Sequence, residues 1–221
     1  MKNKKMFFMI PYLLWIILFV ILPILLILWY SFTDSNNAFT LRNYVEFFKN
    51  GTFLKMMLNS FWYAFLITLL TLVISYPAAY FLIKMKNQQL WLLLIILLKA
   101  YAFIGILGND GLVNKFLHLF GIGPVNILFT DFAFIFVATY IEIPFMILPI
   151  FNAIKEINPA VIHASEDLGA SKWQTFCYVL WPLSRPGVES GVQAIFIPSL
   201  SLFMLTRLIG GNRVITLGTA I

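Results

Sequence analysis

The sequence predicts an all-α membrane protein, a polytopic bundle of about five helices that cross a lipid bilayer. Hydrophobic residues make up 61% of the chain and charged residues only 11%. A soluble domain would be about half apolar and about a quarter charged. Several uninterrupted apolar runs also exceed the length that a soluble helix needs. The net charge of +6 does not indicate a nucleic-acid partner, because there is no basic stripe and basic residues that flank the spans account for it.

The first predicted span covers residues 6–30. It is too long for a secretory signal and has no small-residue cleavage site, so we expect it to remain in the chain. Pro11 and Pro23 are expected to bend it, which neighbouring helices can accommodate. The lysines that precede it place the N-terminus inside the cell; they are Lys2, Lys4 and Lys5.

A mixed polar connection, residues 31–57, separates the first span from the second, which is predicted over residues 58–83. The connection has the length to carry one short amphipathic helix along the membrane surface. Its apolar face would consist of Leu41, Tyr44, Val45 and Phe48. A short loop with Lys84 and Lys86 follows the second span, and we place this loop inside.

The third predicted span, residues 90–107, is short, since its 18 residues rise about 27 Å, barely the thickness of the hydrocarbon layer. Lys99 lies near its middle, where a lysine is costly unless it faces protein or water, so Lys99 is a candidate functional residue. An outer loop, residues 108–126, leads to the fourth span, residues 127–151. That span carries Glu142 near its middle.

The longest polar interruption, residues 152–187, is predicted to form two short helices joined at a sharp corner. Asn158 suits the N-cap of the first helix and Pro159 its first turn. Gly169 then ends that helix in a left-handed C′ position. Ser171 starts the second helix, because Ser-Lys-Trp-Gln is an S-x-x-Q capping box.

The second helix of this segment is amphipathic, with apolar residues at helical spacing: Trp173, Phe176, Cys177 and Leu180. Pro182 and Pro186 are expected to close it. A fifth span is predicted over residues 188–209, with Pro198 at its centre. With five spans and an inside N-terminus, the C-terminus would lie outside.

Two carboxylates, Glu166 and Asp167, occupy the last turn of the first of these short helices. The helix macrodipole disfavours negative charge there by about 0.3–1 kcal/mol each. Either Lys172 and Arg185 compensate these charges, or a partner protein does. The alternative reading of the whole segment is a plain solvated loop.

The sequence contains no catalytic or metal-binding pattern. It has no G-x-x-x-x-G-K-[ST], H-E-x-x-H or G-x-S-x-G motif, and its single cysteine, Cys177, excludes an internal disulfide. His118 has no carboxylate or cysteine at ligand spacing, so we expect no metal site there. The chain is therefore expected to need no cofactor and not to be an enzyme.

The spacing of residues 163–182 resembles the EAA loop of ABC-importer permeases. His-Ala-Ser, three residues, Gly, nine residues and Val-Leu-Trp-Pro stand where the family has Glu-Ala-Ala, three residues, Gly, nine residues and Ile-x-Leu-Pro. In that family a short helix of the loop docks on a separate ATPase subunit. The resemblance implies a type I permease bundle, a single domain over residues 1–221 with residues 152–187 as its cytoplasmic coupling loop. It implies a coupling function for His163, Ala164, Ser165, Glu166, Asp167, Gly169 and Pro182.

Four further segments resemble the permeases of spermidine/putrescine importers: residues 58–63, 140–145, 198–203 and 212–218. The resemblance implies an inner-membrane heterodimer with a second permease, two copies of a cytoplasmic ATPase and an extracytoplasmic polyamine-binding protein. Family members usually have six spans. We therefore expect the sequence to stop before a last helix. Compared with related permeases, the third span is also expected to be shortened by about two helical turns.

A polyamine is a flexible multivalent cation, so its passage calls for carboxylates and aromatic faces along a partly dehydrated route. The candidates for that route are Glu142, Tyr140, Lys99 and Asp131. Glu142 is the strongest, because a buried carboxylate is costly and Pro144 opens the helix beside it. The alternative is a structural pairing of Glu142 with Lys99 or backbone groups. For the whole chain, import of another cargo, such as a metal complex or an amino acid, and assembly without transport also stay open.

Overall fold

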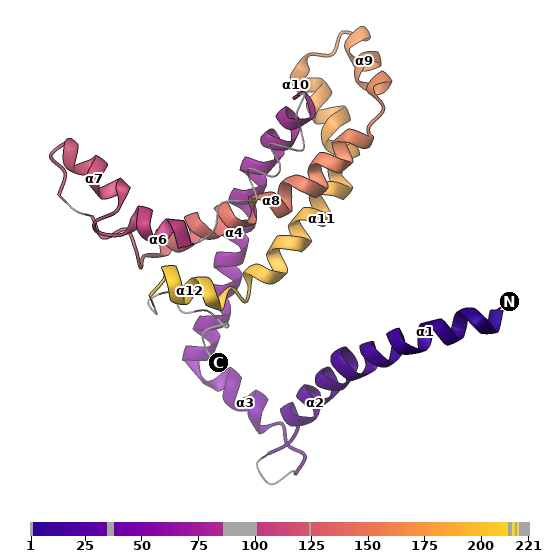
Figure 1. The fold of residues 1–221 in the computed structure, drawn as a ribbon, viewed down its shortest axis with the longest axis vertical. Helices are drawn as coiled ribbons and strands as arrows, with labels where there is room; N and C mark the ends of the chain where they lie inside the picture. The colour runs from indigo at the N-terminus through magenta and orange to yellow at the C-terminus, as the bar shows by residue number, and fades with distance from the viewer. Residues whose placement is uncertain are drawn as a thin grey trace. The chain divides into compact units, whose positions relative to one another are not determined.

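The fold consists of helices throughout the part of the chain that the computed structural model describes, residues 2–34, 38–85, 101–123, 125–211, 214 and 216 (Figure 1). Within these residues the only strand-like pairing is one isolated bridge between Thr33 and Phe39. The all-α prediction is therefore confirmed. The chain divides into two compact units, Met1–Lys55 and Met56–Ile221.

The first unit is built on one continuous helix, formed by α1 (Lys2–Ile16), η1 (Ile17–Ile21) and α2 (Leu22–Ser31). Its segment Met9–Ser31 is long and apolar enough to cross a membrane, as predicted. The π-helical turn η1 ends two residues before Pro23, with the Leu22 N–H donating to the Ile17 carbonyl. Pro23 has no N–H, and its ring would collide with the carbonyl one α-turn earlier, so the wider turn accommodates the proline.

A tight connection links this helix to α3 (Arg42–Lys49), the short amphipathic helix that the sequence predicts. The Ser31 hydroxyl lies 2.6 Å from the Tyr44 hydroxyl, and the rings of Phe32 and Tyr44 are 5.3 Å apart between centroids. Arg42 donates from Nε to Oε1 of Glu46 at 2.6 Å on the polar face. This hydrogen bond to the carboxylate raises the pKa of the Arg42 guanidinium.

The second long helix begins earlier than predicted. α4 (Gly51–Ile83) starts at Gly51 rather than at residue 58. The Asn50 side chain accepts a hydrogen bond from the Thr52 N–H at 3.0 Å, and this cap begins the helix ahead of its apolar run. Lys55 therefore lies inside the helix, which still qualifies as a membrane span by length and composition.

Three long helices form the core of the second unit: α4, α8 (Asp131–Glu156) and α11 (Trp181–Ser199). α4 and α8 run in the same direction, because their contacts keep a constant sequence separation of 68. These contacts join Tyr63 to Asp131, Thr71 to Thr139 and Ser75 to Ile143. α11 runs in the opposite direction, with Tyr76 against Ser184 and Phe61 against Phe196. The relative directions are those predicted for the second, fourth and fifth spans.

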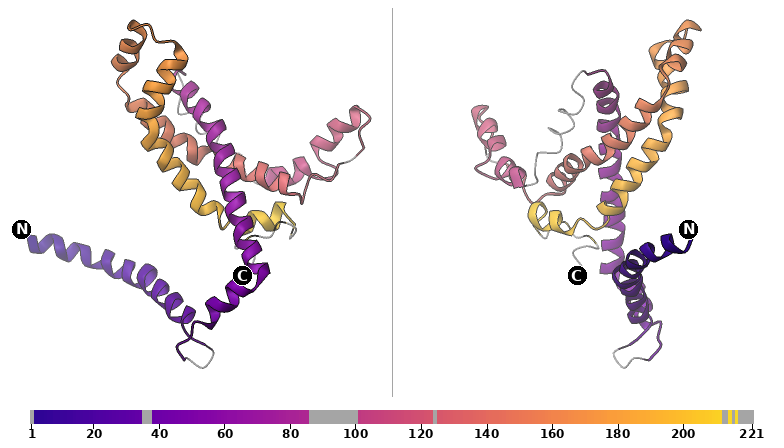
Figure 2. Two further views of the ribbon diagram at one scale, coloured as in Figure 1. Left: turned by 180° about the vertical axis from the view of Figure 1, so that it is seen from behind. Right: turned by 45° about the vertical axis from the view of Figure 1, so that its right-hand side comes forward.

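α8 and α11 lie side by side in both views of Figure 2 and pack closely through two glycines. A Cβ built on Gly187 would lie 2.5 Å from the Pro149 carbonyl oxygen and 2.5 Å from Cβ of Ala153, and one on Gly191 would lie 2.6 Å from Sδ of Met146. The two glycines form a G-x-x-x-G arrangement on one face of α11. In a bilayer, where lipid is as apolar as the helices, such close backbone approach is a main source of helix association.

α8 starts at Asp131 rather than at the predicted residue 127. Phe129 has a left-handed backbone with φ of 66°, which an α-helix does not allow. Thr130 then caps the helix by accepting a hydrogen bond from the Ala133 N–H at 3.2 Å. The helix extends to Glu156, beyond the predicted end at residue 151.

The predicted fifth span, residues 188–209, is broken. α11 ends at Ser199, and α12 (Phe203–Ile209) follows after a break at residues 200–202. Pro198 has no N–H to offer to the carbonyl one turn earlier, which weakens the last turn of α11.

The predicted outer loop, residues 108–126, contains a helix of its own, α7 (Leu112–Leu119), after α6 (Tyr101–Leu107). α6 is the end of the third predicted span, whose earlier part lies outside the described residues, together with Lys86 of the preceding loop. By length and composition, three helices among the described residues qualify as spans: Met9–Ser31, α4 and α8.

Replacing Gly191 by leucine is expected to lower the stability of the second unit, because the new side chain would overlap Sδ of Met146. Overpacking of this kind costs about 1–3 kcal/mol. Ser190→Leu is the matched control, since Ser190 is exposed on the same helix. Thermal unfolding of the detergent-solubilised protein measures both variants. A lower midpoint is expected for Gly191→Leu alone, and equal midpoints would contradict the close packing.

Candidate functional site

The first helix of the polar segment, α9 (Pro159–Asp167), has the ends that the sequence predicts. Asn158 caps its start and accepts a hydrogen bond from the N–H two residues later at 3.0 Å. Gly169 has φ of 84° and closes its end. The Gly169 N–H donates to the Glu166 carbonyl at 2.9 Å, and the Ala170 N–H donates to the Ser165 carbonyl at 3.1 Å. This pair of hydrogen bonds is a Schellman motif, which satisfies carbonyls that a helix end leaves free.

The second helix begins with the predicted capping box and then continues further than expected. Oγ of Ser171 accepts from the Gln174 N–H at 3.3 Å, and Oε1 of Gln174 accepts from the Ser171 N–H at 2.8 Å. α10 (Lys172–Thr175) passes into η2 (Phe176–Leu180) and then into α11 without a break. The prediction that Pro182 and Pro186 close this helix is therefore wrong.

A π-turn explains why Pro182 does not end the helix. The Trp181 N–H donates to the Phe176 carbonyl, five residues earlier. The backbone is thus wider at the point where an α-turn would drive the Pro182 ring into the Tyr178 carbonyl. As a result one helix, from Lys172 to Ser199, joins the polar loop to the core (Figure 1).

One hydroxyl contact holds the two helices of the loop together, and a second fixes the loop to the core. Oγ of Ser165 lies 2.9 Å from Oγ1 of the buried Thr175, which joins α9 to α10. On α4, the Tyr76 hydroxyl lies 2.7 Å from Oγ of Ser184, and the Tyr76 ring packs edge-on against Phe176 at 5.5 Å between centroids. The loop is therefore attached to α4 as well as to its own continuation in α11.

Neither Lys172 nor Arg185, the two basic residues that the sequence suggests, forms an ion pair with the carboxylates at the end of α9. Arg185 pairs with Glu189, Nε to Oε1 at 2.8 Å, and not with either of these acids. Nδ1 of His163 lies 3.6 Å from Oε2 of Glu166. Among the described residues no basic side chain forms an ion pair with Asp167. The exposed Asp167 thus stands at a helix end where negative charge is unfavourable.

Large apolar side chains are exposed on the same loop. Leu168 is 89% exposed, Trp173 71% and Tyr178 79%. Trp173 therefore does not share a buried face with Leu180, as the helical spacing predicts, since Leu180 is 4% exposed. Exposed aromatic and aliphatic side chains beside an unpaired acid are typical of a surface that contacts another protein.

Glu142 lies in the middle of α8 and is 7% exposed. No hydrogen bond or ion pair joins it to another described residue. It stands one turn before Met146, on the stripe of α8 that meets Gly191. The hydroxyls of Thr139 on α8 and Thr68 on α4 are also buried and without a hydrogen-bond partner within the described part of the chain.

Of the other predicted pathway residues, Tyr140 and Asp131 make contacts with residues other than Glu142. The Tyr140 ring contacts Phe103 of α6 at 4.9 Å between centroids. Asp131 lies in the first turn of α8, where negative charge is favourable, and accepts a hydrogen bond from the Tyr63 hydroxyl at 2.9 Å. Lys99 lies outside the described residues, so its pairing with Glu142 stays a prediction.

Three contacts that hold this site together were not predicted from the sequence. The first is the packing of α11 on α8, for which the G-x-x-x-G spacing at residues 187–191 is a sequence signal. The pairs Tyr76–Ser184 and Ser165–Thr175 have no such signal, because their members lie 108 and 10 residues apart and nothing in the sequence relates them.

The sequence is similar to spermidine/putrescine permeases along nearly its whole length. The chain is 35% identical to the spermidine/putrescine transport system permease protein PotB of Salmonella typhimurium (strain SL1344), over 94% of this chain and 78% of that protein. The PotB protein of Escherichia coli (strain K12) is 34% identical over 94% of this chain and 81% of its own length. The chain belongs to the ABC-importer permease family. No protein-family model matches this permease.

A solved structure shows the same fold. The crystal structure of a bacterial alginate ABC transporter, in complex with an alginate pentasaccharide-bound periplasmic protein, contains a chain that aligns with this permease at a TM-score of 0.79 and 17% identity. The alignment covers 99% of this chain and 82% of that chain. This permease is thus a multi-pass inner-membrane transport subunit, as the resemblance of its sequence implies.

Replacing Gly169 by valine is expected to loosen the end of α9, because a left-handed backbone costs an ordinary L-residue about 1–2 kcal/mol. Gly169→Asn is the matched control, since asparagine tolerates this conformation. Amide hydrogen exchange of the detergent-solubilised permease measures the protection of the Gly169 and Ala170 N–H groups. Faster exchange is expected at Ala170 in the valine variant only. The cap would be contradicted by equal protection in the two variants.

Proposed function

We propose that this permease is the membrane subunit of an ATP-driven importer of polyamines such as spermidine and putrescine. The observation that carries the proposal is its similarity to spermidine/putrescine permeases over 94% of the chain. Similarity of this extent takes in α4, α8 and α11, the three helices of the core that contains the buried Glu142, and therefore the region where cargo selectivity would arise.

In the proposed assembly the permease pairs with a second, similar permease and binds a cytoplasmic ATPase dimer and an extracytoplasmic polyamine-binding protein. Residues 152–187 form a cytoplasmic coupling loop within one transmembrane domain, residues 1–221, whose N-terminus is also inside. Within the second unit, the parallel direction of α4 and α8 supports a common side for their C-terminal ends, and the end of α8 leads into the loop. The N-terminal lysines favour the inner side.

The loop is proposed to couple ATP hydrolysis to transport by moving together with the core. The ATPase contacts the exposed end of α9 and the start of α10, at Asp167, Leu168 and Trp173. Gly169 and Pro182 set the geometry of this surface, through the cap of α9 and the π-turn. His163, Ala164, Ser165 and Glu166 belong to the same helix, and the Ser165–Thr175 and Tyr76–Ser184 contacts transmit its displacement.

Glu142 is proposed to contact the cargo. A polyamine carries several positive charges and loses the water that solvates them when it enters the membrane. A buried carboxylate that has no ion-pair partner among the described residues offers a negative charge that compensates this loss. The buried Thr139 hydroxyl, one turn earlier on α8, and the ring of Tyr140 would add further contacts along the route, and Asp131 would lie at the end of the helix where cargo enters. Lys99 would tune the same route if it approaches Glu142.

The ATPase activity of the complete importer reconstituted in lipid vesicles tests the cargo. Addition of spermidine-loaded or putrescine-loaded binding protein is expected to stimulate hydrolysis several-fold, whereas the unloaded binding protein is expected to have little effect. Stimulation by another cargo, with none by a polyamine, would point to a permease of other specificity. Assembly with no stimulation by any cargo would point to a subunit that does not transport.

Glu142→Gln is expected to reduce polyamine uptake by about tenfold or more, because loss of one charge contact in a dehydrated site removes at least about 1.4 kcal/mol. The thermal midpoint is expected to stay the same or to rise, because a buried charge is replaced by a neutral amide. A fall in the midpoint with unchanged uptake would assign Glu142 a structural function instead.

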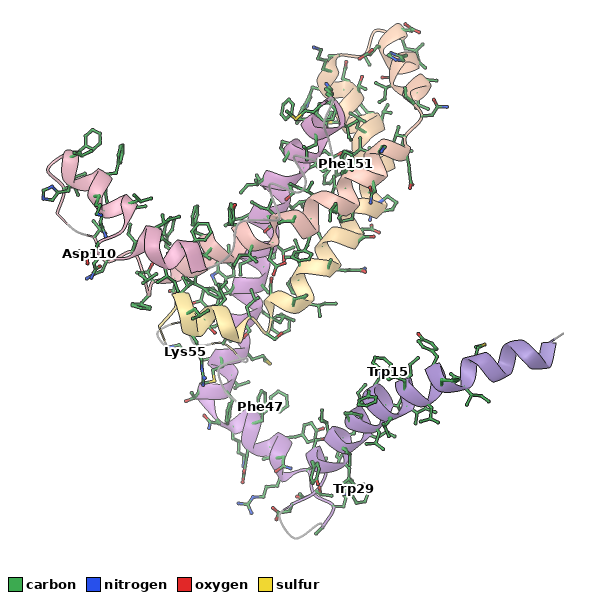
Figure 3. All side chains as sticks on the ribbon, in the orientation of Figure 1. Trp15, Trp29, Phe47, Lys55, Asp110 and Phe151 are labelled. Atoms are coloured by element: carbon green, nitrogen blue, oxygen red, sulfur yellow. The ribbon has the colours of Figure 1, made fainter. Side chains whose placement is uncertain are left out.

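Charge reversal at the end of α9 tests the coupling surface. Asp167→Lys is expected to weaken ATPase contact, so that uptake falls by about tenfold or more while insertion is retained. Asp110→Lys is the matched control, because Asp110 is an exposed carboxylate at the α6–α7 turn, away from the loop (Figure 3). Uptake and ATPase activity are measured on both. Equal uptake in the two variants would remove Asp167 from the coupling surface.

A further inference from the structure

A cavity of about 340 Å³ lies beneath the loop, where the ends of α4 and α8 meet α9 and α10. α4 and α8 are parallel, and α10 leads into the antiparallel α11, so these elements meet at one end of the bundle (Figure 1). Ile83 is the last residue of α4, and Lys155 lies in the last turn of α8. The cavity is therefore level with the ends of two membrane spans.

The lining of this cavity is basic. Three lysines from three different helix ends contribute to it: Lys84 after α4, Lys155 at the end of α8 and Lys172 at the start of α10. Glu166 is the one carboxylate among the described lining residues, and its Oε2 lies 3.6 Å from Nδ1 of His163. Three ammonium groups face one carboxylate, which leaves an excess of positive charge.

The positive charge of the three lysines is not neutralised by other described residues. None of the three forms an ion pair there, whereas Arg42 and Arg185 each pair with a glutamate one turn away. Neutral aromatic groups orient two of the lysines instead. Nζ of Lys84 donates to the Tyr80 hydroxyl at 2.9 Å, and Nζ of Lys155 lies 5.7 Å from the centroid of the Phe151 ring.

The remaining lining is mostly apolar. It includes Ile83, Ile154, Ile162 and Leu180, together with the hydroxyl-bearing Thr175. A small soluble anion would gain nothing from these aliphatic side chains, because it has no apolar part to bury. A phospholipid has both a charged and an apolar part. Its phosphate can contact the ammonium groups, and its glycerol and acyl region can pack against the aliphatic side chains.

We propose that this cavity binds the phosphate headgroup of an anionic phospholipid, such as phosphatidylglycerol, from the adjacent membrane leaflet. Ammonium groups are strong partners for phosphate oxygens, and basic pockets between helices at the inner membrane surface favour anionic headgroups. The volume lies within the range of small-molecule sites. The choice of the inner leaflet rests on the proposed function, which places the loop inside. Binding of a headgroup by the three lysines does not depend on which cargo the permease carries.

A bound headgroup would connect the two helices of the loop, α9 and α10, to the ends of the core helices α4 and α8. The lysines and aliphatic residues of the cavity come from α4, α8, α9 and α10, so one ligand contacts all of them. The phosphate would reduce the repulsion among the ammonium groups and hold the loop against the ends of the spans.

Native mass spectrometry of the full-length permease with added phosphatidylglycerol, and with added phosphatidylcholine as the neutral lipid, tests the proposal. Preferential retention of phosphatidylglycerol is expected. The combined variant Lys84→Gln, Lys155→Gln and Lys172→Gln is expected to lose this preference by on the order of 100-fold, since each basic residue near a membrane surface contributes a factor of about five. The matched control replaces three exposed lysines elsewhere by glutamine, Lys49, Lys55 and Lys115.

Several outcomes would overturn the proposal. Equal retention of the two lipids, or equal loss in the combined variant and its control, excludes a headgroup site in the cavity. Displacement of phosphatidylglycerol by inorganic phosphate at comparable concentration makes a soluble phosphate the ligand. Loss of the lipid when the ATPase subunit binds assigns the lysines to an acidic surface of that partner. If the combined variant does not fold, the single variant Lys172→Glu, at an exposed side chain, is compared with Lys115→Glu. A smaller preference for phosphatidylglycerol over phosphatidylcholine in Lys172→Glu only supports the site, and an equal preference in both variants excludes it.

Discussion

Close packing of α11 against α8 at Gly187 and Gly191 holds the core of the second unit together. Helices in a bilayer gain little from burying apolar surface against each other, so backbone approach and polar contacts must hold the core together. The glycines provide the approach, and the hydroxyl contacts from Tyr76, Thr71 and Ser75 provide the polar contacts. Because α11 continues back into α10, the same packing also fixes the position of the loop.

The continuity of that helix depends on how the chain accommodates proline. Two π-turns, η1 and η2, each end two residues before a proline, at Pro23 and at Pro182. A wider turn removes the collision between the ring and the preceding turn, so the helix continues where an α-helix would kink or stop. In the loop, a stop at Pro182 would have separated α10, which carries Trp173 of the proposed ATPase-contacting surface, from α11, whereas the π-turn keeps α10 and α11 in one helix.

Local signals in the sequence predicted the helix ends of the loop, because a cap involves residues within one turn of each other: Asn158, Gly169 and the Ser171–Gln174 box all stand where expected. The predictions are wrong where packing between distant parts of the chain overrides a local sequence rule. Pro182 breaks an isolated α-helix but not one with a π-turn, and Trp173 fits an apolar stripe yet is exposed beside Asp167. The burial of Glu142 depends on packing across the bundle, which local sequence patterns do not specify, although its position in an apolar run marks it as a candidate.

In the proposed mechanism the loop and the three-helix core move as one body when the ATPase closes. Spin labels at Val161 on α9 and Val73 on α4 measure this within the chain, after Cys177→Ser removes the native thiol; both side chains are exposed, and neither belongs to the proposed ATPase-contacting surface. The Val161–Val73 distance is expected to be the same in the nucleotide-free and ATP-bound importer, while the distance from Val161 to a label on the second permease is expected to change. A changed Val161–Val73 distance, with a constant distance between the two permeases, would show that the loop moves separately from the core.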